Sequence, residues 1–121
     1  MPKVIHFEIP ADNPQRAVEF YKKVFDWKIQ KWEGAVPYWI ISAGEDDESG
    51  ISGAIHEKSN FKTVVNIISV PSIDKFLRKI TEAGGKIVMP KGEVPGGGYI
   101  AYAEDTEGNA FGIFQGKFPI K

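Results

Sequence analysis

An imidazole and a carboxylate stand two residues apart near the start of the chain and could do chemistry together. His6 and Glu8 lie in VIHFEIP (4–10), a segment rich in strand-forming residues. Successive side chains of a strand point to opposite faces, so these two share one face. They could hydrogen-bond a ligand, and His6 could act as a general base near neutral pH. The alternative is a structural histidine paired with its neighbouring carboxylate.

A second group of polar residues, EDTEGN (104–109), has carboxylates around a glycine. A calcium loop of the EF-hand type needs alternating oxygen ligands and a glutamate at its twelfth position, and this segment runs instead into an apolar strand. We therefore predict a tight turn with Gly108 at positive φ. PGGGY (95–99) lacks the glycine spacing of phosphate-binding loops and precedes a strand, so it predicts a hairpin loop.

Composition limits the classes of function. The 121 residues fit one domain, and the net charge of −1 gives no electrostatic basis for binding nucleic acid or an anionic membrane. The sequence has no cysteine, which excludes disulfides and zinc–thiolate sites. It also has no apolar run of about 18 residues and no apolar stretch typical of a signal peptide at its start. We expect a cytoplasmic protein.

The chain contains an internal repeat. When the sequence is shifted by 59 residues, GEDDESGISGAIHEK (44–58) aligns with AEDTEGNAFGIFQGK (103–117) without a gap. The same shift pairs Ile9 with Ile68. We therefore predict a single domain, residues 1–121, made of two modules at about 1–60 and 61–121.

Each half predicts a strand, a helix and three further strands. Asp12 or Asn13 can cap the first helix, with Pro14 in its first turn, and Ser72 can cap the second. Apolar residues recur at helical spacing after both caps, up to Val24 and Phe25 in the first helix and Ala83 in the second. The expected strands cover residues 4–10, 27–33, 37–43 and 51–58, then 63–70, 86–90, 99–104 and 110–116. We expect each helix to cover one face of its sheet, leaving the other face to line a concave cleft.

Two segments resemble a known superfamily. HFEIPADNPQRAVEFYKKVFDW (6–27) resembles the opening of vicinal oxygen chelate proteins, and EVPGGGYIAYAEDTEGNAFGIFQ (93–115) is similar to their closing segment. This superfamily includes glyoxalase I, extradiol dioxygenases, and the fosfomycin- and bleomycin-resistance proteins. The resemblance implies an α+β fold of the glyoxalase/bleomycin resistance/dihydroxybiphenyl dioxygenase type, with two βαβββ modules forming curved sheets around a cleft. It also implies a homodimer.

The resemblance gives four positions for metal ligands. Enzymes of the superfamily place ligands on the first and last strands of each module, and those positions read His6, Gly53, Val65 and Gly112 here. His6 alone matches a ligand position, so the resemblance implies no metal site. Glu8 beside His6 leaves open a site with non-standard ligands.

We predict a glyoxalase/bleomycin-resistance-like protein that binds a small apolar or aromatic molecule without a cofactor. The glycines would leave open volume at the ligand positions, unless Trp39 or Phe114 fills it. The predicted ligand-binding residues are His6, Glu8, Trp39, Gly53, Tyr99, Gly112 and Phe114. Two alternatives remain: a metal-dependent lyase, isomerase or dioxygenase, related to lactoylglutathione lyase and using Zn, Ni, Fe or Mn, and a scaffold without a ligand. Whether a reaction is catalysed stays open.

Overall fold

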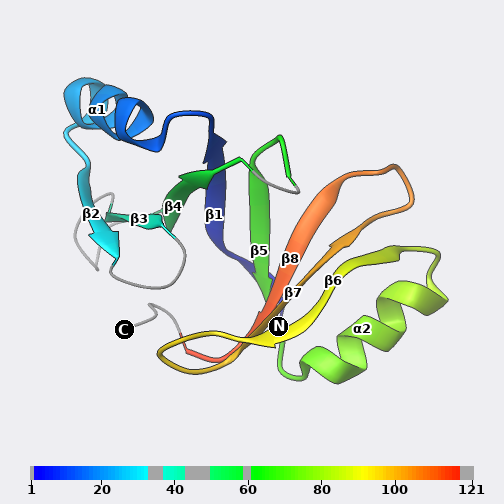
Figure 1. Cartoon of the computed structure of the whole chain (residues 1–121). Helices are drawn as coiled ribbons and strands as arrows, with labels where there is room; N and C mark the ends of the chain where they lie inside the picture. The colour runs from blue at the N-terminus through cyan, green and yellow to red at the C-terminus, as the bar shows by residue number, and fades with distance from the viewer. Residues whose placement is uncertain (1, 33–36, 43–49, 59–60, 118–121) are drawn as a thin grey trace. The chain divides into compact units, whose positions relative to one another are not determined.

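The computed structural model describes residues 2–32, 37–42, 50–58 and 61–117 (Figure 1). The chain packs as two compact units. The units are His6–Val65, and Asn66–Lys121 together with Met1–Ile5. We call them the first and the second module, and we assign a strand that crosses a boundary to the module that holds most of its residues. The first-half acidic segment, EDDESG (45–50), lies largely outside the described residues.

The first module contains one helix and four strands. Its strand order is β2-β3-β4-β1, with β4 parallel to β1 and the other neighbours antiparallel. The helix α1 lies beside β2 and β4. The elements are β1 (Lys3–Ala11), α1 (Pro14–Phe25), β2 (Lys28–Trp32), β3 (Tyr38–Ser42) and β4 (Ser52–Glu57).

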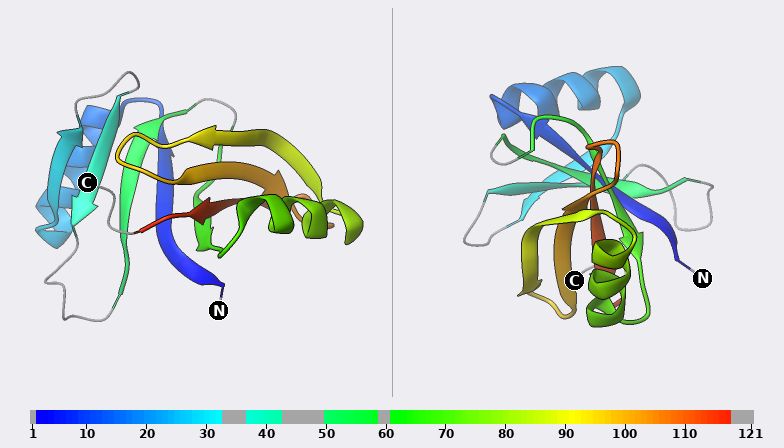
Figure 2. Two further views of the ribbon diagram at one scale, coloured as in Figure 1. Left: turned by 90° about the horizontal axis from the view of Figure 1, so that it is seen from below. Right: turned by 90° about the vertical axis from the view of Figure 1, so that its right-hand side faces the viewer.

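The second module repeats this arrangement. Its strand order is β5-β8-β7-β6, with β8 parallel to β5, and α2 packs along β6, β7 and β8 (Figure 2). The predicted α+β fold with two βαβββ modules is therefore confirmed. The elements are β5 (Val65–Ser69), α2 (Ile73–Glu82), β6 (Lys86–Glu93), β7 (Tyr99–Glu104) and β8 (Ala110–Gln115).

Both helices begin at the predicted caps. The side chain of Asn13, rather than Asp12, accepts a hydrogen bond from the backbone N–H of Arg16 at 3.1 Å. Ser72 does the same for Lys75 at 3.3 Å. These bonds satisfy backbone donors that have no partner within the first helical turn, which fixes where each helix starts.

Each helix covers one face of its own sheet. The buried cluster beneath α1 contains Ile29, Ile41 and Ile55, and the partly buried Trp39 packs against this cluster. The C-terminal end of α1 departs from the predicted apolar stripe, because Val24 and Phe25 are 53% and 54% exposed. The cluster beneath α2 contains Val70, Ile73, Ala101 and Ile113, with Tyr99 packed against it.

The repeat is not gapless in three dimensions. Ile9 pairs with Ile55 in the first module, and Ile68 pairs with Ile113 in the second. The offset is therefore 59 residues between the first strands of the two modules and 58 between their last strands. Ala54, not Gly53, is thus the structural counterpart of Gly112. A one-residue offset reverses the face on which every side chain of the strand lies.

Candidate functional site

The candidate site lies on the face of the first-module sheet that is opposite α1. Ile9 and Ile55 belong to the α1 side, so the residues that alternate with them point the other way. We call this surface the His6 face. Strand alternation and register assign to it Gln30, Trp32, Tyr38, Ile40, Ala54 and His56, as well as His6 and Glu8.

Three polar side chains on the His6 face form a hydrogen-bonded chain. The hydroxyl of Tyr38 donates to Oε2 of Glu8 at 2.8 Å. Nε2 of His6 lies 3.1 Å from the same hydroxyl oxygen. Both His6 and Glu8 are buried, with 7% and 6% of their surface exposed. Burying polar or charged groups costs free energy unless they have partners, so the Tyr38 hydroxyl stabilises both groups.

Tyr38 reaches these partners across an intervening strand. The order β3-β4-β1 puts Tyr38 two strand spacings, about 10 Å, from the backbone of Glu8. Its side chain must therefore cross β4 on the His6 face. The β4 residue that is paired with Glu8 on this face is Ala54, which is fully buried. A small residue at this position leaves room for the crossing.

Burial sets the protonation state of His6. The pKa of His6 is lowered, chiefly because burial removes water from around the imidazolium ion, while the charge of Glu8 acts in the opposite direction. A lowered pKa leaves the ring neutral near pH 7, so it can act as a hydrogen-bonding group or a base.

Trp39 and Tyr99, which were predicted to bind ligand, do not lie on the sheet faces that were expected to line a cleft. Trp39 packs into the cluster beneath α1, and Nζ of Lys31 lies 5.5 Å from its ring centre. Tyr99 packs against the cluster beneath α2. Both residues therefore lie on the helix sides of their sheets, and their part in binding a ligand stays a prediction. Phe114 lies on the side away from α2 and is fully buried, so its part in binding stays a prediction.

The two glycines do not leave open volume. Gly53 lies on the α1 side, where a Cβ atom would come within 2.6 Å of the ring and the carbonyl oxygen of Phe7. At Gly112 a Cβ atom would lie 2.5 Å from Ile67 and 3.1 Å from Tyr102. Neighbouring side chains thus fill the space at both positions, and they are not Trp39 or Phe114.

Sequence reasoning missed Tyr38 and Ala54. Tyr38 stands beside Trp39, and alternation shows only that the two side chains point to opposite faces. The side that each one takes depends on the register of β3 against β4 and of β4 against β1, which is not visible in the sequence. Ala54 was missed because the gapless repeat assigned its role to Gly53.

The acidic turn is structural, as predicted. The Asp105 carboxylate accepts hydrogen bonds from the backbone N–H groups of Glu107 and Asn109 at 2.8 and 2.9 Å, and Gly108 has φ 83°. The pKa of Asp105 is lowered, first by the backbone N–H of Asn109 and then by its side-chain amide. The Asp105 carboxylate thus organises the turn between β7 and β8.

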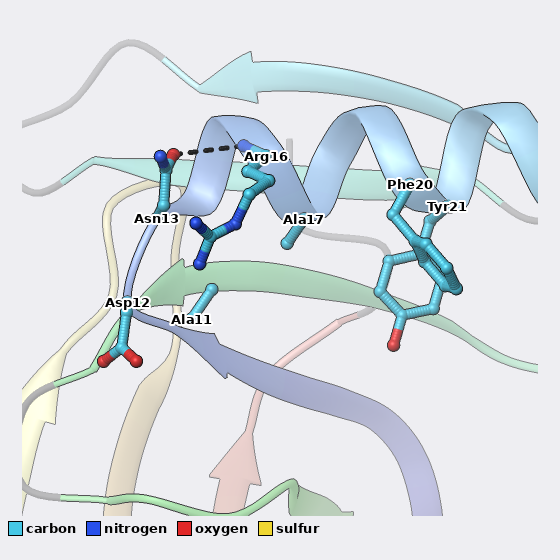
Figure 3. A pocket seen from close by; sticks show the side chains of 7 residues that line it. All are labelled: Ala11, Asp12, Asn13, Arg16, Ala17, Phe20 and Tyr21. Carbon is cyan, nitrogen blue, oxygen red and sulfur yellow. Dashed lines mark hydrogen bonds between the residues drawn. The ribbon is translucent and has the colours of Figure 1, made fainter.

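A separate hollow of about 420 Å³ runs along α1 (Figure 3). Its wall includes Arg16, Phe20 and Tyr21, and Asn13 in this wall is already occupied in capping the helix. Asp12 lies 3.4 Å from Nζ of Lys58, and both side chains are exposed. The charged and amide side chains in the wall of this hollow are exposed, whereas the side chains of His6 and Glu8 are buried, so the hollow is a weaker candidate than the His6 face.

Comparison with known proteins decides the family. The model of the Glyoxalase/Bleomycin resistance protein/Dioxygenase superfamily matches residues 3–113. The chain belongs to this superfamily. The resemblance predicted from the two segments is thus confirmed. No curated protein matches the chain.

Solved structures of this superfamily fold cover nearly the whole chain. A hypothetical protein from Bacillus halodurans has a TM-score of 0.74 at 16% identity, covering 99% of this chain and 98% of its own. Methylmalonyl-CoA epimerase in complex with methylmalonyl-CoA and NH4+ has a TM-score of 0.73 at 13% identity, with coverages of 100% and 98%. A Streptomyces coelicolor methylmalonyl-CoA epimerase has a TM-score of 0.72 at 13% identity, with coverages of 98% and 96%. At these identities the similarity shows the fold alone.

The donors present do not match the four-ligand metal site of the superfamily. In the described ranges, no group of three or more His, Cys, Asp or Glu side chains could hold a metal ion. His6 and Glu8 supply two donors, and the phenol of Tyr38 would have to lose its proton to supply a third.

Among the helices of the described ranges, none is long and apolar enough to span a membrane.

Proposed function

We propose that this superfamily member binds a small apolar or aromatic molecule on the His6 face without a metal. The observation that supports this proposal is the buried chain of hydrogen bonds from Glu8 through Tyr38 to His6. The polar part of the ligand would lie against this chain. A few buried polar groups among apolar and aromatic side chains are typical of small-molecule sites.

The surroundings of the chain favour a flat apolar ligand. The rings of Trp32 and Tyr38 meet edge to face, with centroids 6.2 Å apart and planes at 75°. Both residues are partly exposed, as is Ile40 beside them. A ligand ring could therefore pack against these two aromatic side chains and gain both apolar burial and ring contacts.

A metal-dependent lyase, isomerase or dioxygenase is the second candidate. It is favoured by His6, which stands on the first strand where the superfamily resemblance expects a ligand, with Glu8 two residues further on. Two structures with similar folds are methylmalonyl-CoA epimerases, one in complex with methylmalonyl-CoA and NH4+ and one in complex with 2-nitronate-propionyl-CoA. We therefore include methylmalonyl-CoA among the molecules to be tested.

Thermal denaturation of metal-free protein tests the proposal. The panel contains indole, other aromatic compounds, methylmalonyl-CoA, and Zn, Ni, Fe and Mn ions. We expect an aromatic compound to raise the melting temperature without metal, and Tyr38→Phe to reduce that rise. The matched control is Tyr99→Phe, which removes a hydroxyl on the α2 side of the other module. The binding proposal fails if no compound raises the melting temperature.

Metal analysis of protein purified without chelators separates the two candidates. Near-stoichiometric metal that disappears in His6→Ala would exclude metal-free function. A homodimer, which the superfamily resemblance implies, stays a prediction. Sedimentation velocity of the full chain checks it directly.

A further inference from the structure

The outer side of α1 carries apolar side chains that are exposed to solvent. Phe20, Val24 and Phe25 are 57%, 53% and 54% exposed, and they are three of the seven exposed large apolar residues in the described ranges. Phe20 and Val24 stand four residues apart, so they lie on adjacent turns of one helix face. Figure 3 shows the side chain of Phe20 on the wall of the hollow that runs along this helix. Apolar residues gathered in one place, unlike scattered single ones, mark an interaction surface.

A row of alternating charges runs beside the apolar pair. The row consists of Arg16, Glu19, Lys23 and Asp26. These residues are spaced by three, four and three positions, which aligns them along the helix, and all four are exposed. The row is symmetric about Tyr21, because the two inner charges stand two residues from it and the two outer charges five. Each positive charge therefore has a negative charge at the same distance on the other side of Tyr21.

We infer that α1 is the docking surface for α1 of a second copy of this chain, in an antiparallel pair whose two-fold axis passes at the level of Tyr21. This arrangement puts Glu19 opposite the partner's Lys23, and Arg16 opposite the partner's Asp26. Because the axis is two-fold, each pairing occurs twice. A parallel pair would put every charge against its own copy, so the charges favour the antiparallel arrangement.

The apolar residues fit the same arrangement. With the axis at Tyr21, the level of Phe20 on one helix is about 3 Å along the axis from the partner's Val24. Phe20 would therefore pack against the partner's Val24 near the centre of the interface, where aromatic side chains contribute most to binding. A helix of 12 residues is only about 18 Å long, so the interface is small, and we expect a dissociation constant in the micromolar range.

Pairing within one helix is the alternative use of these charges. Glu19 and Lys23 stand four residues apart, a spacing at which opposite charges of one helix can pair. The ion pairs found among the described residues involve neither of them, since they join Lys58 to Asp12 and Lys91 to Asp74. Their charges therefore remain available to a second copy.

The docking surface is separate from the proposed ligand site. Helix α1 covers one face of the first-module sheet, and the His6 face is the opposite one. The inference therefore goes beyond the proposed function and does not depend on it. It names the surface through which the expected homodimer would form.

Sedimentation equilibrium of the full chain from about 1 to about 500 µM measures the dissociation constant. We expect a monomer–dimer equilibrium that Phe20→Glu weakens about thirtyfold or more, the loss typical of a central interface residue. Val64→Glu is the matched control, because Val64 is 55% exposed and stands just before β5 rather than on α1. It should leave association unchanged, and circular dichroism checks that both variants fold.

A charge exchange tests the antiparallel arrangement and separates it from pairing within one helix. Glu19→Lys and Lys23→Glu each put like charges opposite one another in a homodimer, so each should weaken self-association about tenfold. When the two variants are mixed in equal amounts, each meets the complementary charges of the other. They should then associate as tightly as the unaltered chain does with itself. Pairing within one helix predicts no such recovery on mixing.

Three results would each overturn the inference. The first is a chain that stays monomeric over the whole concentration range. The second is a dimer that Phe20→Glu leaves intact or that Val64→Glu abolishes instead. The third is the absence of recovery when the two charge variants are mixed, which decides the point even if Phe20→Glu fails to fold.

Discussion

Removing the hydroxyl of Tyr38 should destabilise the protein more than removal of any single exposed hydroxyl. Tyr38→Phe keeps the ring but takes away the donor to Glu8 and the acceptor for His6, at 2.8 and 3.1 Å. A hydrogen bond to a charged group contributes about 1.5–3 kcal/mol and a neutral one about 0.5–1.5 kcal/mol. His6 and Glu8 make further interactions, which moderates the loss. We therefore expect the free energy of unfolding to fall by about 2 kcal/mol.

Urea denaturation followed by circular dichroism measures this change. The control is Tyr99→Phe, which keeps the ring that packs against Lys91 and the α2 cluster. A double-mutant cycle with Glu8→Gln isolates the contact, and we expect a coupling energy of about 1 kcal/mol or more.

Two results would refute the reasoning. One is a loss below about 0.5 kcal/mol for Tyr38→Phe, which is the range of ordinary surface substitutions. The other is additivity of Tyr38→Phe and Glu8→Gln, since residues that share a hydrogen bond should not act independently.

Three further substitutions or conditions follow from the same geometry. Ala54→Leu should block the path of Tyr38 across β4 and cost about 1–3 kcal/mol, and a calorimetric titration should show that ligand binding is lost with it. Gly53→Ala should be destabilising by denaturation although it adds one methyl group, because its Cβ would lie 2.6 Å from a backbone oxygen of β1. The pKa of His6 is lower in the folded state than in the unfolded state. Below about pH 6.5 the unfolded chain therefore binds more protons than the folded chain, and the free energy of unfolding falls as the pH drops through that value. The difference in stability between pH 7 and pH 5 should shrink in His6→Gln and persist in His56→Gln; an unchanged difference in His6→Gln would contradict the cause given for the shift.

The elements of this fold could be predicted from the sequence because their signals are local. Asn13 and Ser72 mark the helix starts, and apolar spacing distinguishes helices from strands. The acidic segment at Asp105 was predicted as a turn for the same reason. In each case the partners of the hydrogen bonds stand within a few residues of one another.

The site was predicted only in part because its signals are not local. His6 and Glu8 share a strand, so alternation alone puts them on one face. The choice of Tyr38 over Trp39, and of Ala54 over Gly53, depends on inter-strand register, where a shift of one residue reverses the face. The residues of β3 and β4 do not by themselves show that register. The repeat appears gapless in the sequence, and this alignment assigned the residues of β4 to the wrong face of the sheet.

The crossing of β4 by Tyr38 has a consequence for local unfolding. Strands β1 and β3 are not neighbours, yet a side-chain hydrogen bond joins them across the His6 face of β4. Separating β1 from the sheet must therefore break that bond as well as the β1–β4 ladder. In native-state hydrogen exchange, the amides of β1 and β3 on either side of β4 should open with a common free energy. In Tyr38→Phe the two strands should exchange independently, which would show that one hydroxyl makes three strands behave as a single cooperative element.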